Sequence, residues 1–403
     1  MLQFKPDDQG VYPFLQLGFR PFFLLALSGA VVLGVLWSAI YSFTLPLLRP
    51  DYSFISWHAH EMIFAYAFAV VSGFLLTAVR NWTQIQTVNG WSLLLLAIFW
   101  CVGRVLPFMP AVPLWYLAVH DLLFMALILF FAALPVFRKK QWQQLVIFGL
   151  LGMMMLANLL FHLGLMKVGG LNTQIGLYFG LYIFVALILT MGRRVIPGFI
   201  ENAIGGGFQA RNNVWLDWFS RAVFAVFLLA ELIVLYNGNA TAVFISAVAA
   251  LLLFVLHLSR LSGWHHRALW LHPLLWSLYI AYAWIAFGFL LKFLTMALGL
   301  NNPWAAVHAF TYGGIGLITA GMMARVILGH TGRNVFAPPP SLGIWFGLLV
   351  AGAFVRVVLV LLWPAEYQVW ILASQLLWLA GFAGLLVIFT PMLFKARVDG
   401  RYG

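Results

Sequence analysis

The sequence contains about twelve continuous apolar runs, each long enough to cross a lipid bilayer as a helix. A hydrocarbon core about 30 Å thick requires roughly 20 apolar residues per helix. The runs lie near residues 20–43, 58–79, 91–109, 114–136, 143–166, 173–191, 214–236, 241–260, 271–297, 305–329, 341–363 and 367–391. Charged residues make up only 8% of the 403 residues, whereas a soluble domain has about 25%. Because the runs are continuous rather than alternating, a β-barrel is a poor alternative, and we predict an all-α polytopic membrane protein.

The Lys and Arg residues predict the orientation of the spans. With the N-terminus in the cytoplasm, all but five of the 22 Lys and Arg residues lie in cytoplasmic joints or at cytoplasmic span ends. Twelve spans then place both termini in the cytoplasm. The N-terminal segment is polar and acidic and lacks the features of a cleavable signal peptide. No joint, including the longest from about Gly192 to Asn213, could hold a soluble domain. We therefore expect residues 1–403 to form a single twelve-span transmembrane domain.

The net charge of +12 does not indicate nucleic-acid binding. The basic residues are spread over the joints between spans and are not gathered with aromatic residues in one soluble patch. Membrane orientation explains this charge, so we expect the lipid bilayer and not a nucleic acid as partner.

A faint repeat recurs every four spans. The second, sixth and tenth spans all run inward and end near Arg80, Arg193 with Arg194, and Arg325. The second and tenth also carry His-Ala near the outer end, at His58 and His308. Three groups of four helices would produce this pattern, and so would the positive-inside rule alone.

The stretch from Trp57 to Val79, WHAHEMIFAYAFAVVSGFLLTAV, places two histidines and a glutamate at the outer end of an apolar span. Ionisable side chains in a membrane are costly and usually face the interior of a helix bundle, where they bind or relay a ligand. The predicted orientation divides the ten histidines into two groups. The outer group is His58, His60, His120, His162 and His308, and the cytoplasmic group is His257, His265, His266, His272 and His330.

The outer histidines are candidates for a metal or haem site, because neutral imidazole is a common ligand of both. Cys101 is the only cysteine, so thiolate clusters are excluded and a metal must use His, Met, carboxylate or backbone ligands. On a helix His58 and His60 point about 200° apart, so they cannot both reach one ion unless the helix is unwound. They could serve two centres, or one could be a ligand and the other a hydrogen-bond partner.

A single histidine at a span end is more often an interfacial or packing residue. This reading suits His257, His265 and His266. It suits His58, His60 and His308 less well, because they recur at one depth with Glu61 beside them. Asp121, next to His120, could orient an imidazole or bind water.

Five cations break the orientation rule, namely Arg49, Arg104, Lys167, Lys292 and Arg356. Arg104, Lys292 and Arg356 lie in the outer part of spans three, nine and eleven and need counter-charges. We count only four carboxylates in the outer half: Asp51, Glu61, Asp121 and Glu366. Haem propionates would supply the missing charge; the alternative is that these side chains reach the lipid phosphates.

Four motifs together resemble the NnrS family of bacterial inner-membrane proteins. They are the stretch from Trp57 to Val79, GFRPFFLLA from Gly18, RRVIPGFIENA from Arg193, and HAFTYGGIGLITAGMMARVILGHTGR from His308. The resemblance implies a twelve-span protein of the bacterial inner membrane that carries haem and copper. It also implies an association with denitrification and protection against nitric oxide and nitrosative stress.

The resemblance assigns motif positions to His58, His60, Glu61, Arg193 or Arg194, His308, Arg325 and His330. Two positions depart from the family pattern: Arg80 precedes Asn81 where a proline is expected, and Ile200 replaces an expected threonine. Both lie in cytoplasmic joints, so they cast doubt on a cytoplasmic role.

We expect a b-type haem in the outer half, ligated by His308 and by His58 or His60. Arg104 and Arg356 would neutralise its propionates, and His162 or His120 could hold copper or a second haem. His272 is a further candidate site residue. Nitric oxide is the expected small-molecule ligand, and a quinol or other donor would supply electrons if it is turned over. Haem-copper oxidases are similar in outline, although the only adjacent histidine pair, His265 and His266, lies on the cytoplasmic side. A secondary transporter and a haem or copper trafficking protein are the alternatives.

Overall fold

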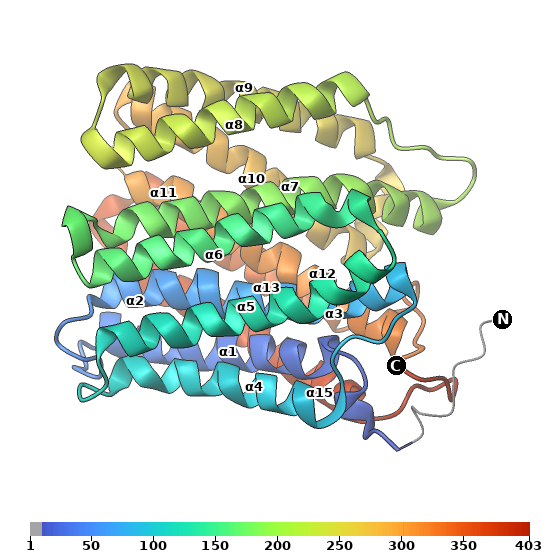
Figure 1. Ribbon diagram of the computed structural model, residues 1–403. Helices are drawn as coiled ribbons and strands as arrows, with labels where there is room; N and C mark the ends of the chain where they lie inside the picture. The colour runs from blue at the N-terminus through green and yellow to red at the C-terminus, as the bar shows by residue number, and fades with distance from the viewer. Residues whose placement is uncertain (1–9, 301) are drawn as a thin grey trace. The chain divides into compact units, whose positions relative to one another are not determined.

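The protein is helical throughout the part of the chain that the structure describes. A computed structural model describes residues 10–300 and 302–403 and contains no β-strand in these ranges (Figure 1). Twelve helices among these residues are long and apolar enough to cross a membrane. The prediction of an all-α polytopic membrane protein with twelve spans is therefore confirmed. The cytoplasmic location of both termini and the likeness to haem-copper oxidases stay predictions.

Several spans consist of consecutive helical segments. The first six spans are α1 (Phe19–Tyr41); α2 (Phe54–His60), the π-helix η3 (Glu61–Ala67) and α3 (Phe68–Thr83); α4 (Gly90–Val105) and η4 (Leu106–Phe108); α5 (Leu114–Arg138); η5 (Trp142–Gln144) and α6 (Leu145–Leu165); and α7 (Thr173–Ile204). The last six are α8 (Val214–Asn237); α9 (Ala240–Trp264); α10 (Pro273–Leu298); α11 (Pro303–His308), the π-helix η8 (Ala309–Gly316) and α12 (Leu317–His330); α13 (Leu342–Phe354), the π-helix η9 (Val355–Leu359) and α14 (Val360–Leu362); and η10 (Pro364–Glu366) and α15 (Tyr367–Phe394). Three short 3₁₀ helices lie outside the spans: η2 (Pro13–Leu15), η6 (Val168–Gly170) and η7 (Arg267–Leu271).

The sixth span is longer than the sequence indicates. We expected it to end near residue 191, but α7 continues through Pro197 to Ile204. The paired arginines mark where basic residues favour the cytoplasmic side, and they do not mark a helix end. The long joint therefore shortens to the segment that follows Ile204 and ends at Asn213.

The chain forms two compact units. The first contains residues 1–177, 323–338 and 382–403, and the second contains residues 178–322 and 339–381. Each unit is assembled from separate stretches of the chain, and three of the four boundaries fall inside α7, α12 and α15. The single-domain organisation over residues 1–403 stays a prediction.

In the first unit, α1 packs against α3, and α5 packs against α3, α4 and α6. The Phe19 N–H donates to Thr77 Oγ1 at 3.0 Å, joining α1 to α3. A Cβ at Gly73 would lie 2.8 Å from the ring of Phe23, so this close approach requires glycine.

In the second unit, α9 packs against α8 and α10, and α8 and α9 run side by side (Figure 1). The buried rings of Phe227, Phe289 and Phe310 meet edge to face, with centroids 5.5 and 4.9 Å apart. Such contacts add to the stabilisation that burial of the rings provides.

The three spans linked by the sequence repeat are also the most buried. Burial reaches 83% in the second span, 72% in the sixth and 78% in the tenth. The second and tenth spans also share a π-helix that begins directly after His60 and after His308, respectively. The positive-inside rule does not predict the burial pattern, so this pattern favours the repeat. The π-helices carry less weight, because the eleventh span also contains one, η9.

Candidate metal centre

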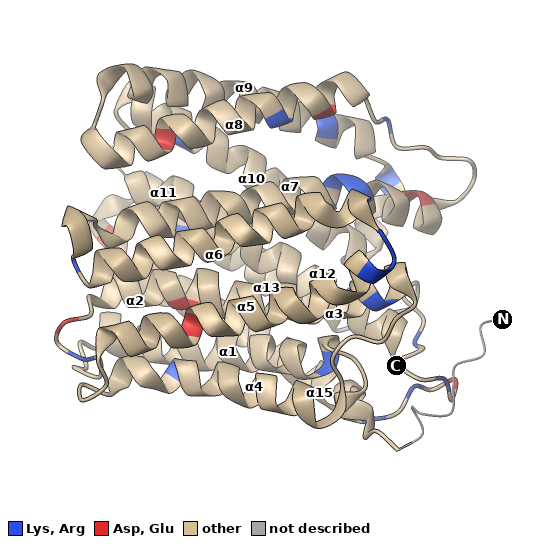
Figure 2. Ribbon diagram, in the orientation of Figure 1, with Lys and Arg blue, Asp and Glu red and all other residues tan. Residues whose placement is uncertain are grey.

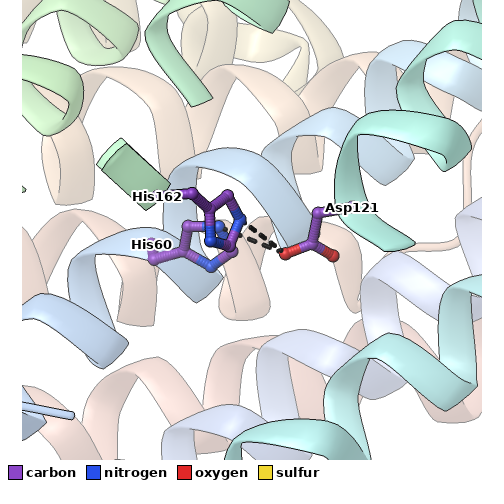
Figure 3. A group of neighbouring side chains, drawn as sticks. All are labelled: His60, Asp121 and His162. Atoms are coloured by element: carbon purple, nitrogen blue, oxygen red, sulfur yellow. Dashed lines mark hydrogen bonds and ion pairs between the residues drawn. The ribbon is translucent and has the colours of Figure 1, made fainter. Parts of the chain in front are cut away.

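Two histidines and an aspartate of the first unit converge in the membrane-spanning part (Figure 3). His60 Nε2 lies 3.4 Å from Asp121 Oδ2, and His162 Nε2 lies 3.3 Å from the same oxygen. One donor atom from each residue lies within 4.8 Å of the other two, as ligands of one metal ion do. Both histidines are buried. We call these three residues the histidine–aspartate cluster.

Helical spacing places the cluster and its neighbours on facing sides of α5 and α6. Asp121 and Met125 are four residues apart on α5, and Asn158 and His162 are four residues apart on α6, so each pair shares one helix face. Asn158 Oδ1 lies 3.0 Å from His60 Nε2, and its amide group donates to Met125 Sδ at 3.3 Å. His60 is the last residue of α2 and precedes a π-helix, a distortion frequent at functional sites.

Arg104 joins the cluster to Glu61. Its Nη1 donates to Glu61 Oε2 and its Nη2 to Asp121 Oδ1, both at 2.6 Å. Glu61 Oε1 lies 3.2 Å from His60 Nδ1. In Figure 2, the red position in the second span lies beside the red position in α5. Arg104 therefore receives its counter-charges from the chain itself, without a cofactor.

His120 is buried beside the cluster, and none of the described residues forms a hydrogen bond with either of its ring nitrogens. Its ring stacks on Phe99 with centroids 4.0 Å apart, and its Nδ1 lies 3.9 Å from Asp121 Oδ1. Buried polar atoms are usually hydrogen-bonded, so an imidazole that lacks hydrogen bonds at both nitrogens requires an explanation. His162 Nδ1 is also buried and forms no hydrogen bond with the described part of the chain.

His58 has different surroundings from His60. Its ring stacks on Trp37, with centroids 4.0 Å apart and planes 15° apart. The two histidines thus face different neighbours, as their helical spacing predicts.

His308 and Arg356 belong to the second unit and contact each other. His308 Nδ1 donates to the Trp304 carbonyl at 2.8 Å, and Arg356 Nη2 donates to His308 Nε2 at 3.1 Å. The prediction that His308 and His58 or His60 share a haem iron stays a prediction.

The remaining candidate residues lie outside the cluster. Arg193 donates to Asp217 of α8 at 3.0 Å, and Arg194 follows it on α7. His272 occupies the position directly before the first residue of α10. Arg325 is on α12, and His330 packs against Phe19 with ring centroids 5.5 Å apart.

The structure corrects our count of carboxylates in the outer half. Glu231 of α8 was left out, and it pairs with Lys292 at 2.7 Å. A glutamate inside an apolar run was itself a usable signal, because such residues are rare within spans. Asn158 was also missed, and nothing in its local sequence distinguishes it from a helix-packing residue.

Fold and site together define a multi-pass helical membrane protein with a buried histidine–carboxylate group suited to a metal ion. The profile of one family, described as NnrS protein, matches residues 13–397. The chain therefore belongs to the NnrS family. No curated protein sequence matches it.

Proposed function

We propose that this protein binds copper at the histidine–aspartate cluster and protects the bacterial cell against nitric oxide. The observation that carries the proposal is the convergence of His60, Asp121 and His162 in a chain of the NnrS family. The link to nitric oxide comes from the resemblance to this family. We place the protein in the bacterial inner membrane with this cluster towards the periplasm.

The spacing of the cluster fits a transition metal. Bonds of about 2.0–2.1 Å to tetrahedral ligands place neighbouring donor atoms about 3.3–3.4 Å apart. The two measured separations between ring nitrogens and Asp121 Oδ2 are 3.4 and 3.3 Å. Imidazole suits copper, zinc, iron and nickel, and the thioether of nearby Met125 favours copper among them. His120, whose ring nitrogens form no hydrogen bond with the described residues, would supply a further ligand.

The surrounding residues would orient the ligands. Glu61 holds the His60 ring through Nδ1, and Arg104 fixes both Glu61 and Asp121. Such partners set ring orientation and tune metal affinity. Burial of His60 and His162 limits access of water. Bound copper would supply a centre that binds nitric oxide and exchanges one electron.

Haem is a separate proposal for the second unit. The His308 tautomer, with Nδ1–H donating to a backbone carbonyl, is the one an axial ligand needs. Arg356 donates to His308 Nε2, and Asn158 contacts His60 Nε2, so a metal at either histidine would replace a hydrogen bond. We propose b-type haem with a quinol donor from the family resemblance alone.

A secondary transporter is the second candidate. The π-helices after His60 and His308 interrupt spans two and ten at corresponding positions. Interrupted helices in corresponding positions mark the substrate sites of many transporters. In a transporter or a metal-trafficking protein, the cluster would exchange its metal readily with a chelator.

Metal quantification together with an anaerobic absorption spectrum tests the proposal. We expect the purified protein to retain copper against a chelator, and His60→Gln and His162→Gln each to lose most of it. His257→Gln is the control, because His257 is equally buried but lies in the second unit. His308→Ala tests whether His308 binds haem. If the native protein has no Soret band, or if the variant keeps the same band, His308 is not a haem ligand. Full copper occupancy in His162→Gln, or copper lost to the chelator from the native protein, contradicts the copper proposal.

A further inference from the structure

Arg104 determines the net charge around the histidine–aspartate cluster. Its side chain donates to Glu61 Oε2 and to Asp121 Oδ1, both at 2.6 Å. A guanidinium stays protonated in proteins, and contacts this short indicate that both carboxylates are ionised. Among the described residues, Arg104 is the only Lys or Arg that pairs with either carboxylate. Two carboxylates and one guanidinium therefore give this group a net charge of minus one.

Little solvent reaches these charges. The side chains of Glu61, Arg104 and Asp121 are 2%, 12% and 13% exposed. His60 and His162 add no charge, because imidazole binds metals in its neutral form. An unbalanced charge in such surroundings is costly, since a medium of low dielectric neither solvates nor screens it. The charge that a bound ion brings therefore decides how well the ion is accommodated.

Asp121 links Arg104 directly to the histidines of the cluster. Its Oδ1 accepts from Arg104, while its Oδ2 lies 3.4 Å from His60 Nε2 and 3.3 Å from His162 Nε2. Arg104 and a bound metal would thus contact opposite oxygens of one carboxylate, so their charges would interact strongly. Met125 lies one helical turn from Asp121 on the same face of α5, and its soft thioether suits Cu⁺.

We propose that Arg104 makes the histidine–aspartate cluster selective for Cu⁺ over divalent ions such as Zn²⁺. This inference rests on the proposal that the cluster binds copper. With Arg104 in place, a bound Cu⁺ leaves the group neutral, whereas a bound Zn²⁺ leaves it with an excess positive charge. Loss of Arg104 makes the group more negative, and this attracts a divalent ion more strongly than a monovalent one. Loss of the Glu61 charge has the opposite effect.

Metal titrations of the purified full-length protein measure this selectivity. Anaerobic titrations with Cu⁺ and with Zn²⁺, each against a coloured chelator of that ion, give the ratio of the two dissociation constants. Arg104→Gln is expected to shift this ratio at least about tenfold towards Zn²⁺, because close buried charges interact by more than the free energy of a tenfold change. Arg104→Lys keeps the charge and should shift the ratio much less.

Further variants separate the effect of charge from a loss of structure. Glu61→Gln keeps the oxygen that faces His60 Nδ1 and should shift the ratio towards Cu⁺. The double variant Glu61→Gln with Arg104→Gln has the native net charge and should restore the native ratio. Lys292→Met is the control, because it removes a largely buried cation of the second unit and should leave the ratio unchanged.

The outcomes distinguish this inference from the copper proposal. If the native protein binds Cu⁺ and Arg104→Gln leaves the ratio unchanged, the cluster binds copper but Arg104 does not set its selectivity. If the native protein binds no Cu⁺, the copper proposal fails and the inference fails with it. If Arg104→Gln does not fold, Glu61→Gln decides. A ratio that stays unchanged in this variant, or moves towards Zn²⁺, overturns the inference.

Discussion

The ion pair between Glu231 and Lys292 gives a stability prediction that can be worked out from its contacts. Glu231 is 1% exposed, and the Lys292 side chain is 18% exposed. Glu231 Oε2 accepts from Lys292 at 2.7 Å and from Tyr182 at 2.6 Å, while Oε1 accepts from Ser246. These four residues come from α10, α8, α7 and α9, so the carboxylate links four helices of the second unit.

Lys292→Met leaves the buried carboxylate with two neutral donors. Removing one partner of a buried pair typically costs about 3–5 kcal/mol. We therefore expect unfolding to become easier by about 3 kcal/mol.

Reversible unfolding in mixed detergent micelles, followed by circular dichroism, measures this change. The double variant Glu231→Gln with Lys292→Met removes both charges and should recover most of the lost stability. If the free energy of unfolding of the single variant lies within about 0.5 kcal/mol of that of the native protein, the ion pair contributes no more than a solvent-exposed pair does. A double variant as unstable as the single one would refute the reasoning from buried charge.

Two further predictions concern local packing and acid stability. Gly103→Ala places a Cβ 3.0 Å from Cε1 and Nδ1 of His120 and should lower the free energy of unfolding by about 1–3 kcal/mol. Gly149→Ala, in open space on α6, should instead raise it by about 1 kcal/mol. Equal unfolding midpoints for the two variants would contradict this prediction. The hydrogen bond from Arg49 holds the pKa of Asp51 below its usual range, so the pair stabilises the fold fully at neutral pH and is lost as pH falls below about 4. Asp51→Asn should therefore reduce the loss of stability at acid pH. The effect should be small, because the Asp51 side chain is 50% exposed. An unchanged dependence of stability on pH would mean that the ion pair does not stabilise the fold.

The sequence alone determined the class of fold. Each span needs only a continuous apolar run of bilayer length, which is a local property, so twelve spans could be predicted without knowledge of packing. Burial of the second, sixth and tenth spans supports the four-span repeat that the motifs suggested. The sequence did not indicate that the helix of the sixth span continues beyond residue 191 to Ile204, because hydropathy and charge mark the membrane boundary and not the helix terminus.

Only the tertiary structure decided which side chains meet. The sequence placed His60, His162 and Asp121 at a similar depth, but helix rotation and packing bring both imidazoles to within 3.4 Å of the Asp121 carboxylate. The same holds for Glu231 and Lys292, whose pairing depends on how α8 faces α10. Depth in the membrane follows from position along one helix, whereas convergence depends on the relative rotation of several helices, which no single stretch of sequence specifies.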